Sequence, residues 1–332
     1  MVPERTAAAY GPGVTGASKA VLLELMAVLR TYRDALVLVG GWAPYFLLER
    51  SGASRGSFAP YHEGSAPRGG EAEMSTLKGS NAELRPSRRG TGFVHVGSID
   101  IDLAVDPALV DEPAYATIVE LLTERRYRPA SNRRGEPNPS SFERTVSSPV
   151  TGKPYTIRVD FLTRLDEARL GRQRHQRQVQ DGLFARKVKG CEAAFAHRTV
   201  VEIAGALPDG GEMVLPLSVA DVVGCLTMKG IVLGERYREK DAYDIYALIA
   251  HAGSGPRDIA AAVRPHLEDP LVRDGMDGIR RAFATRQANG PAWVGAFLIN
   301  PVFAGAYQRL VTDAFMVVQE FSAALVDVPP AS

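Results

Sequence analysis

The chain is poor in the residues that build metal centres and disulfide frameworks. It has only two cysteines, Cys191 and Cys225, and neither belongs to a CxxC pair or has a histidine at metal-ligand spacing. We therefore expect both to be reduced thiols in or near the core. The six histidines are scattered without an HxH or HExxH pattern, so the sequence gives little support to a zinc site.

Long apolar runs and a one-sided charge are also missing. No run approaches the roughly 20 residues that cross a bilayer. Residues 1–20 have no basic start followed by an apolar stretch and a cleavage site, so we expect a cytoplasmic protein with no membrane segment. The net charge of +1 neither requires nor excludes a nucleic-acid partner, and local patches must decide.

What the sequence does contain is a globular composition and enough length for two domains. Of its 332 residues, 45% are apolar and 23% charged, as in ordinary soluble proteins. A chain of this length can bury two cores of normal size. We place the boundary near residue 165, between a domain of residues 1–165 and a domain of residues 166–332.

The first half of the chain alternates between strand and helix patterns. Apolar residues at helical spacing predict a helix over 18–31, with Ser18 able to cap its start. A short apolar strand over 35–39, a Gly-Gly pair and a helix reaching Arg50 follow. Residues 51–93 are rich in Gly, Ser, Pro and Arg without apolar periodicity, so we expect a flexible insertion there.

Strand patterns resume after this insertion. Apolar residues at strand spacing predict strands over 95–105, 141–148 and 155–163, and apolar residues at helical spacing predict a helix over 112–126. We therefore expect the first domain to be a mixed sheet flanked by helices, which makes the fold class α+β.

The second half begins with a basic run and continues mainly as helices. Residues 166–181 crowd several arginines together and are either a solvated linker or an arm that contacts phosphates. Two short β pieces, 198–205 and 212–217, flank a turn. Helical patterns that should stack as a bundle follow at residues 219–233, 240–253, 256–267, 270–285 and 305–326.

Two acids interrupt the apolar pattern in the stretch GSIDIDLAVD. Because side chains alternate along a strand, Asp100 and Asp102 share one face while the apolar residues between them share the other. Their Cβ atoms would be roughly 7 Å apart, a separation that lets two carboxylates bridge divalent cations. Ordinary surface strands also carry this pattern, so the pair alone leaves both interpretations open. Asp106, just before a proline, is better explained as a turn residue.

A third acid, Asp160, lies in the middle of the strand over 155–163, on the same face as Arg158. If this strand lies beside the strand of Asp100 and Asp102, the three carboxylates converge. They could then hold two Mg²⁺ ions for in-line phosphoryl or nucleotidyl transfer. The alternative is that Asp160 is a strand-edge residue paired with an arginine.

Gly40 and Gly41 end an apolar strand and open a helix. Unpaired backbone N–H groups and the helix dipole favour an anion at such a position, and glycine lets a phosphate approach closely. A Gly-Gly pair is also common in ordinary tight turns, so this feature has two interpretations as well.

A basic block lies in the helical half. Spacings of 7, 4 and 4 residues would place four side chains on one side of a continuous helix, namely Lys229, Arg236, Lys240 and Asp244. Gly234 favours a break in that helix. Lys229 would emerge from a largely apolar helix and either reach a triphosphate or extend its ammonium group to solvent. Asp241 and Asp244 would orient the lysines or stabilise a helix start.

The chain resembles a known family in four stretches, which occur in the order LVLVGGW, SIDIDLAV, IRVDFL and MKGIVLGERYREKDAYDIYAL. The first three are similar to the signature of the nucleotidyltransferase superfamily, and the last looks like the AbiEii-type toxins of type IV toxin–antitoxin systems. The resemblance implies a polymerase-β-like core followed by a mainly helical domain. It implies two Mg²⁺ ions and the transfer of a nucleoside monophosphate from an NTP to RNA, such as a tRNA 3′ end, or to another macromolecule. It also implies a cognate antitoxin protein.

The same resemblance assigns roles to particular residues. The metal ions would be held by Asp100, Asp102 and Asp160, and Asp160 would also act as the base for the acceptor hydroxyl. The nucleotide would be bound by Gly40, Gly41, Ser98, Lys229, Arg236 and Lys240. The catalytic set would comprise Asp100, Asp102, Asp160, Lys229 and Asp244. Ser98 stands where many family members have threonine, and the insertion at 51–93 is longer than in compact members.

Two other functions remain open from the sequence. A small-molecule nucleotidyltransferase, of the kind that modifies aminoglycosides, would use the same chemistry but favour an acidic pocket for its cationic substrate. A non-catalytic interaction protein that keeps the fold should have lost at least one metal-binding acid, and none is missing.

Overall fold

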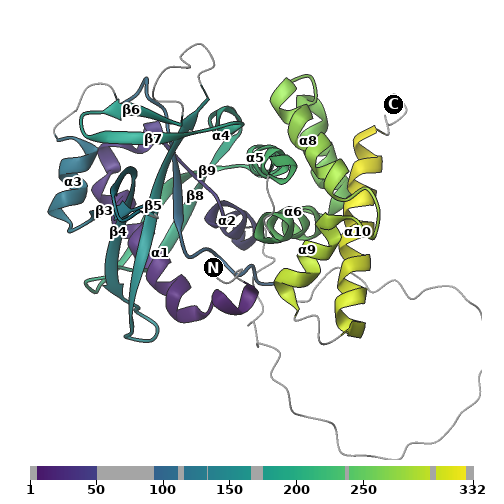
Figure 1. The fold of residues 1–332 in the computed structure, drawn as a ribbon, viewed down its shortest axis with the longest axis horizontal. Coiled ribbons are helices and arrows are strands. Elements are labelled where there is room, and N and C mark those ends of the chain that lie inside the picture. Colours follow the sequence, from purple (N-terminus) through teal and green to yellow (C-terminus); the bar gives the residue numbers. More distant parts are fainter. Residues whose placement is uncertain are drawn as a thin grey trace, which may run out of the picture.

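The computed structural model of the chain has an α+β fold, in which a mixed sheet lies on one side and a layer of helices on the other (Figure 1). The structure describes residues 6–50, 93–110, 116–132, 134–165, 175–235, 239–299 and 304–326. The predicted insertion, apart from Phe93, and Arg236 of the basic block lie outside the described residues. The fold class is therefore confirmed at the level of α+β.

The sheet has nine strands in the part of the chain that the structure describes. Its main path runs β3-β4-β5-β2-β1-β9-β8, and β7 pairs with both β5 and β6. The strands are β1 (Leu36–Val39), β2 (Ile101–Val105), β3 (Arg128–Ser131), β4 (Pro137–Ser147), β5 (Pro154–Arg164), β6 (Gln176–Gln180), β7 (Leu183–Val188), β8 (Arg198–Ala206) and β9 (Glu212–Ala220). Because β2 pairs antiparallel with β1 and parallel with β5, the sheet is mixed, as predicted.

The two central strands are short and almost entirely apolar. All residues of β1 are buried, and Ile101 and Leu103 of β2 are fully buried with the partly exposed Asp102 between them. β2 begins at Ile101, later than the predicted start at residue 95, because the chain turns through Gly97 at a φ of 76° and bends again before the strand. Asp100 therefore lies just before β2 and not within it.

Helices cover the sheet and build the second layer. Those nearest the strands are α1 (Pro12–Val28), α2 (Trp42–Arg50), α3 (Ile118–Glu124) and α4 (Cys191–Ala196). The described residues also form 3₁₀ turns at Ala7–Ala9, Arg30–Ala35 and Arg264–His266. The helical layer contains α5 (Val222–Glu235), α6 (Glu239–His251), α7 (Pro256–Val263), α8 (Pro270–Ala282), α9 (Asn289–Leu298) and α10 (Ala304–Val326). The predicted helical second half is thus present, with a break between α5 and α6 just after Gly234.

Helix α1 starts earlier than the sequence pattern suggested. It begins at Pro12, because Gly11 is extended and proline suits the first turn of a helix. The predicted cap Ser18 is therefore wrong. Ser18 is fully buried inside the helix, where its Oγ accepts a hydrogen bond of 3.0 Å from Nε1 of Trp42 in α2. This bond fixes α2, the helix that follows the Gly-Gly turn, against α1.

The sheet continues past residue 165, where the domain boundary was predicted. Strands β6 to β9 follow that point, and β9 pairs in parallel with β1 through Leu38 and Val219. The sequence predicted β8 and β9 but not β6, whose residues are mostly polar, nor α9, whose glycines and proline obscure its helical pattern. Residues 166–174 of the basic run lie outside the described residues.

Both cysteines of the chain lie in the core. Cys191 and Cys225 are both buried and unpaired, as expected from the sequence. Among the described residues, no helix is long and apolar enough to cross a membrane.

Candidate functional site

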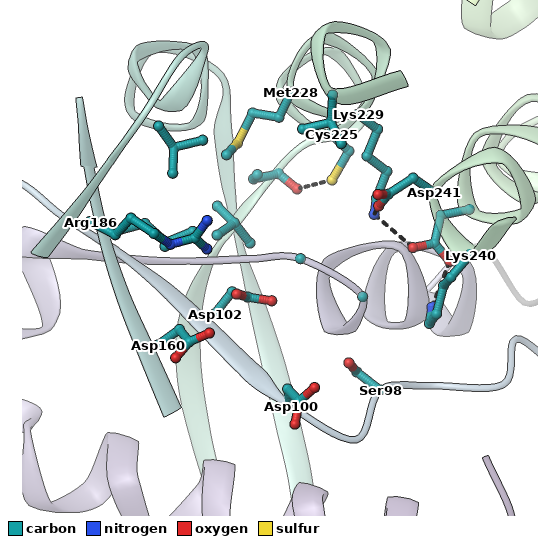
Figure 2. A pocket seen from close by; sticks show the side chains of 18 of the residues that line it. Ser98, Asp100, Asp102, Asp160, Arg186, Cys225, Met228, Lys229, Lys240 and Asp241 are labelled. Carbon is teal, nitrogen blue, oxygen red and sulfur yellow. Dashed lines mark hydrogen bonds and ion pairs between the residues drawn. The ribbon is translucent and has the colours of Figure 1, made fainter. Parts of the chain in front are cut away.

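A pocket of about 290 Å³ lies where β1, β2, β5, β7 and β9 meet α5 and α6 (Figure 2). It collects residues from distant parts of the sequence. Every described member of the predicted site lines it, and these are Gly40, Gly41, Ser98, Asp100, Asp102, Asp160, Lys229, Lys240 and Asp244. The strands therefore bring the acids, the glycine turn and the lysines of the helical layer to one place.

The acids meet because β2 and β5 are neighbours in parallel register. Asp102 and Asp160 are direct Cα partners across these strands, and Asp100 lies two residues before Asp102 (Figure 2). Burial raises the pKa of Asp102 to about 6, and the charges of Asp160 and Asp100 add to this rise. A cation in the pocket would stabilise the ionised Asp102 against both its burial and the repulsion from Asp160 and Asp100.

Asp160 has protein partners of its own. Its Oδ1 accepts a short hydrogen bond from the Ser141 hydroxyl of β4, and Nε of Arg158 lies 3.9 Å away. The arginine pairing proposed as the alternative from sequence is therefore present, but as a long and partly exposed contact. Asp160 faces the pocket from the middle of β5, so it lies beside Asp102 and near Arg158 at the same time.

The acids fit a metal ion that arrives with a phosphate better than they fit a closed metal cage. Within the described ranges, no group of three or more His, Cys, Asp or Glu side chains could hold a metal ion. In nucleotide sites, however, Mg²⁺ is usually held by one or two carboxylates together with phosphate oxygens and water. The coupled carboxylates of Asp102 and Asp160 satisfy that smaller requirement.

The Gly40–Gly41 turn packs directly against Asp102, Ser98 and Lys240. Gly40 has a φ of 68°, and a Cβ there would overlap the Asp102 carboxylate. A Cβ on Gly41 would lie 2.9 Å from Ser98 Oγ and 3.0 Å from Lys240 Nζ. Gly40 therefore has to be glycine, whereas a side chain at Gly41 would displace the side chains of Ser98 and Lys240. The backbone of the turn borders the pocket at the point where α2 begins. A helix start supplies backbone N–H donors to an anion.

Asp244 of α6 holds both lysines of the predicted site. Its carboxylate is 1% exposed and accepts hydrogen bonds from Lys229 Nζ at 2.7 Å and Lys240 Nζ at 2.8 Å. Lys229 also contacts Asp241 at 3.0 Å. The lysines come from two separate helices, α5 and α6, and Asp244 brings their ammonium groups together beside the Gly41 turn.

The charges of this cluster are set by burial and by the number of partners. Burial raises the pKa of Asp244, but Lys229 and Lys240 outweigh it and hold that pKa well below its usual range. Burial lowers the pKa of Lys229, but the two carboxylates it faces outweigh this and raise it. Burial lowers the pKa of Lys240, and the charge of Lys229 lowers it further. The attraction of the Asp244 carboxylate does not outweigh these two effects. Asp244 is therefore an ionised anchor for the lysines.

The sequence interpretation missed three residues of this region. Arg186 of β7 points into the pocket on the side opposite Lys240 (Figure 2), and Tyr10 lies in the lining with its ring 5.3 Å from Lys240 Nζ. His95 is buried behind the pocket and contacts Asp244. Polar residues within otherwise apolar stretches, as in FVHVG and LFARKV, are the signals that could have marked His95 and Arg186.

Arg186 differs from the lysines, which both pair with Asp244. It makes no ion pair or side-chain hydrogen bond with the residues that the structure describes, although its charge lowers the pKa of Asp102. Arg158 borders the same pocket from β5. Cations therefore lie on both sides of the acids, with the lysine pair near the glycine turn and the arginines along β5 and β7.

Comparisons of the chain with protein-family models, curated proteins and solved structures found no match.

Proposed function

We propose that the chain is a metal-dependent nucleotidyltransferase, similar to AbiEii-type toxins, that transfers a nucleoside monophosphate from an NTP to RNA. The observation that carries the proposal is the register of Asp102 beside Asp160, in a pocket that also holds the glycine turn packed on Asp102 and the two lysines that Asp244 anchors. Acids for cations, a turn without side chains and fixed ammonium groups are the parts that phosphoryl-transfer sites share.

The proposed roles follow from where each group lies. The Gly41 turn, Ser98 and the lysines Lys229 and Lys240 would bind the triphosphate, since they gather at one end of the pocket. Asp102 and Asp160 would hold Mg²⁺ together with phosphate oxygens and water, and Asp100 lines the same pocket two residues before Asp102. The metal neutralises phosphate charge when bound. Asp244 would position the two lysines, because its carboxylate is occupied by their ammonium groups.

The reaction itself joins one oxygen to phosphorus and releases another. An acceptor hydroxyl forms an O–P bond to the α-phosphorus, the bond to the β-phosphate oxygen breaks, and pyrophosphate leaves toward the lysines. The proton of the hydroxyl passes to a carboxylate at the acidic end, for which Asp160 is the candidate. Its Oδ1 lies 3.9 Å from Arg158 Nε, and an acceptor that enters on this arginine side would lie opposite the leaving pyrophosphate.

The proposal is tested by incubating the purified chain with each of the four labelled NTPs, Mg²⁺ and total cellular RNA. We expect label from at least one NTP to enter RNA, and chelation of Mg²⁺ to abolish the transfer. Calorimetry with Mg²⁺–NTP supplies an independent measurement of nucleotide binding. An absence of both labelling and binding would favour the non-catalytic interaction protein. A cognate antitoxin belongs to the proposal, and co-expression would test it by suppressing the labelling.

The two arginines along β5 and β7 favour a phosphate-bearing acceptor over an aminoglycoside. Arg158 and Arg186 lie on the acceptor side, and guanidinium groups bind phosphates and repel a cationic drug. Arg186→Gln is therefore expected to weaken binding of unfractionated tRNA and to reduce the slope of log K against log salt by about 1. Fluorescence anisotropy at several salt concentrations measures both quantities.

A matched control for this prediction is Arg128→Gln. Arg128 is an exposed strand arginine on β3, at the far edge of the sheet from β8 and outside the pocket lining. It should leave the affinity and the salt slope unchanged. An Arg186→Gln protein with the same slope as the wild type, or label transferred from NTP to an aminoglycoside in place of RNA, would support the small-molecule enzyme.

A further inference from the structure

His95 is a buried histidine that contacts both the helical layer, at Asp244, and the turn before β2, at Gly97. Its side chain is 0% exposed, and its Nε2 lies 2.8 Å from Oδ1 of Asp244 in α6. Its Nδ1 lies 3.1 Å from the backbone nitrogen of Gly97, in the turn that leads to Ser98 and Asp100. One ring therefore touches the anchor of the lysines and the turn that carries pocket residues of the sheet.

The hydrogen-bond partners fix the tautomer of this ring. The Gly97 nitrogen is a donor, so Nδ1 must accept and carries no proton. Asp244 is an ionised acceptor, so Nε2 carries the proton and donates it. Only the neutral imidazole with its proton on Nε2 can make both bonds at once.

The surroundings of His95 maintain this neutral state and hold the ring in place. Burial lowers its pKa to about 4 even though the hydrogen bond to Asp244 raises it, and the charges of Lys240 and Lys229 lower it further. The ring stacks on Tyr243 with centroids 5.0 Å apart and meets the edge of Tyr45 at 6.3 Å. The Tyr243 hydroxyl also accepts the Val96 N–H at 3.3 Å, which fixes the chain beside His95.

We infer that His95 is a positioning residue that aligns the two parts of the nucleotide site. Through Nε2 it completes the set of three donors around Asp244 and so fixes the orientation in which Asp244 holds Lys229 and Lys240. Through Nδ1 it anchors the Gly97 turn. This inference rests on the proposed function only in naming the triphosphate as the group that the aligned residues bind.

Two amide substitutions separate the two bonds of the ring. In His95→Gln the amide nitrogen can take the place of Nε2 and donate to Asp244. In His95→Asn the shorter amide can place its oxygen near Nδ1 and accept from Gly97, but it cannot reach Asp244. The pair therefore tests which bond matters for the lysines, with similar changes in polarity and burial.

The probe for this test is inorganic tripolyphosphate, measured by calorimetry without Mg²⁺ so that the acids are not required. We expect His95→Asn to weaken its binding by about tenfold or more, the cost of losing a hydrogen bond to a charged group, and His95→Gln to retain most of the affinity. His266→Asn, at a histidine of the 3₁₀ turn after α7, is a control that should bind like the wild type. Equal affinities for the two His95 variants would overturn the inference.

A second measurement needs neither a variant nor nucleotide transfer. Nitrogen NMR of the imidazole in the wild-type protein should show His95 neutral, with its proton on Nε2, from about pH 5 to about pH 8. A charged ring or a proton on Nδ1 in that range would overturn the inference whatever the enzyme does. Conversely, a wild-type protein that shows the expected His95 tautomer but does not bind tripolyphosphate would count against the proposed function. The contacts of His95 with Asp244 and Gly97 would then still stand.

Discussion

Asp102→Asn is expected to reduce nucleotide transfer to RNA by about 10³-fold or more, because it removes the carboxylate at the centre of the acidic set. Asp102 is the residue through which the other two acids are coupled, since both Asp160 and Asp100 raise its pKa. It also lies against Gly40, so its carboxylate faces the turn that would hold the triphosphate. Single-turnover incorporation of labelled NTP into RNA measures the loss.

The variant should remain folded, which makes the loss interpretable. Burial and neighbouring charges raise the pKa of Asp102 to about 6, so above that pH the folded protein holds an ionised carboxylate that it disfavours. A neutral amide removes this cost, and thermal unfolding near neutral pH should show no decrease in stability. A residual transfer rate close to that of the wild type would mean that the acids are not catalytic.

Asp106→Asn is the matched control, because Asp106 follows the other end of the same strand. Its carboxylate pairs with Arg164 and accepts the Ala108 N–H in a turn, as its position before a proline suggested. It does not belong to the pocket lining. Transfer should therefore be nearly unchanged, and a large loss here would point to damage of β2 in place of a specific role for Asp102.

The acidic part of the site could be predicted because the position of a residue in a strand decides which face of the sheet its side chain lies on. A period of two places Asp102 opposite the buried Ile101 and Leu103, and the same rule places Asp160 on the pocket face of β5. What the pattern cannot supply is the pairing of two strands that lie more than 50 residues apart in the chain. The parallel register that sets Asp160 beside Asp102 belongs to the tertiary structure. From the sequence, convergence of the acids could only be predicted for the case that the two strands are neighbours.

For the lysine cluster, the helical spacing pointed to the right residues, but it did not reveal what brings them together. The spacing aligned them on a continuous helix, although Gly234 favoured a break, and Lys229 and Lys240 do lie on two helices, α5 and α6. Their meeting depends on Asp244, which is buried and accepts from both. His95 could not be placed from sequence at all, because its partner Asp244 lies 149 residues away.

The position of α5, and therefore of Lys229, depends on an unusually close contact with α8. Gly230 of α5 packs against Gly275 and Gly278 of α8, where a Cβ on Gly230 would overlap the Gly275 carbonyl oxygen. A Cβ on Gly275 would lie 2.7 Å from Cα and O of Thr227. The obstacles are backbone atoms on both sides, so no side chain can rotate away to make room. The two helices touch through their main chains.

Gly230→Ala is accordingly expected to destabilise the protein by about 3 kcal/mol or more, since the added methyl group forces α5 and α8 apart. Gly234→Ala is its control one turn later in the same helix, where a Cβ would meet only the flexible end of Arg281 at 3.6 Å. There the change should stabilise by about 0.5–1 kcal/mol, the ordinary gain of alanine over glycine in a helix. Denaturant unfolding of both variants measures the difference. Opposite signs for one substitution at two positions would show that contact with α8, and not helix propensity, decides where α5 presents Lys229. A Gly230→Ala protein as stable as the wild type would contradict the close crossing.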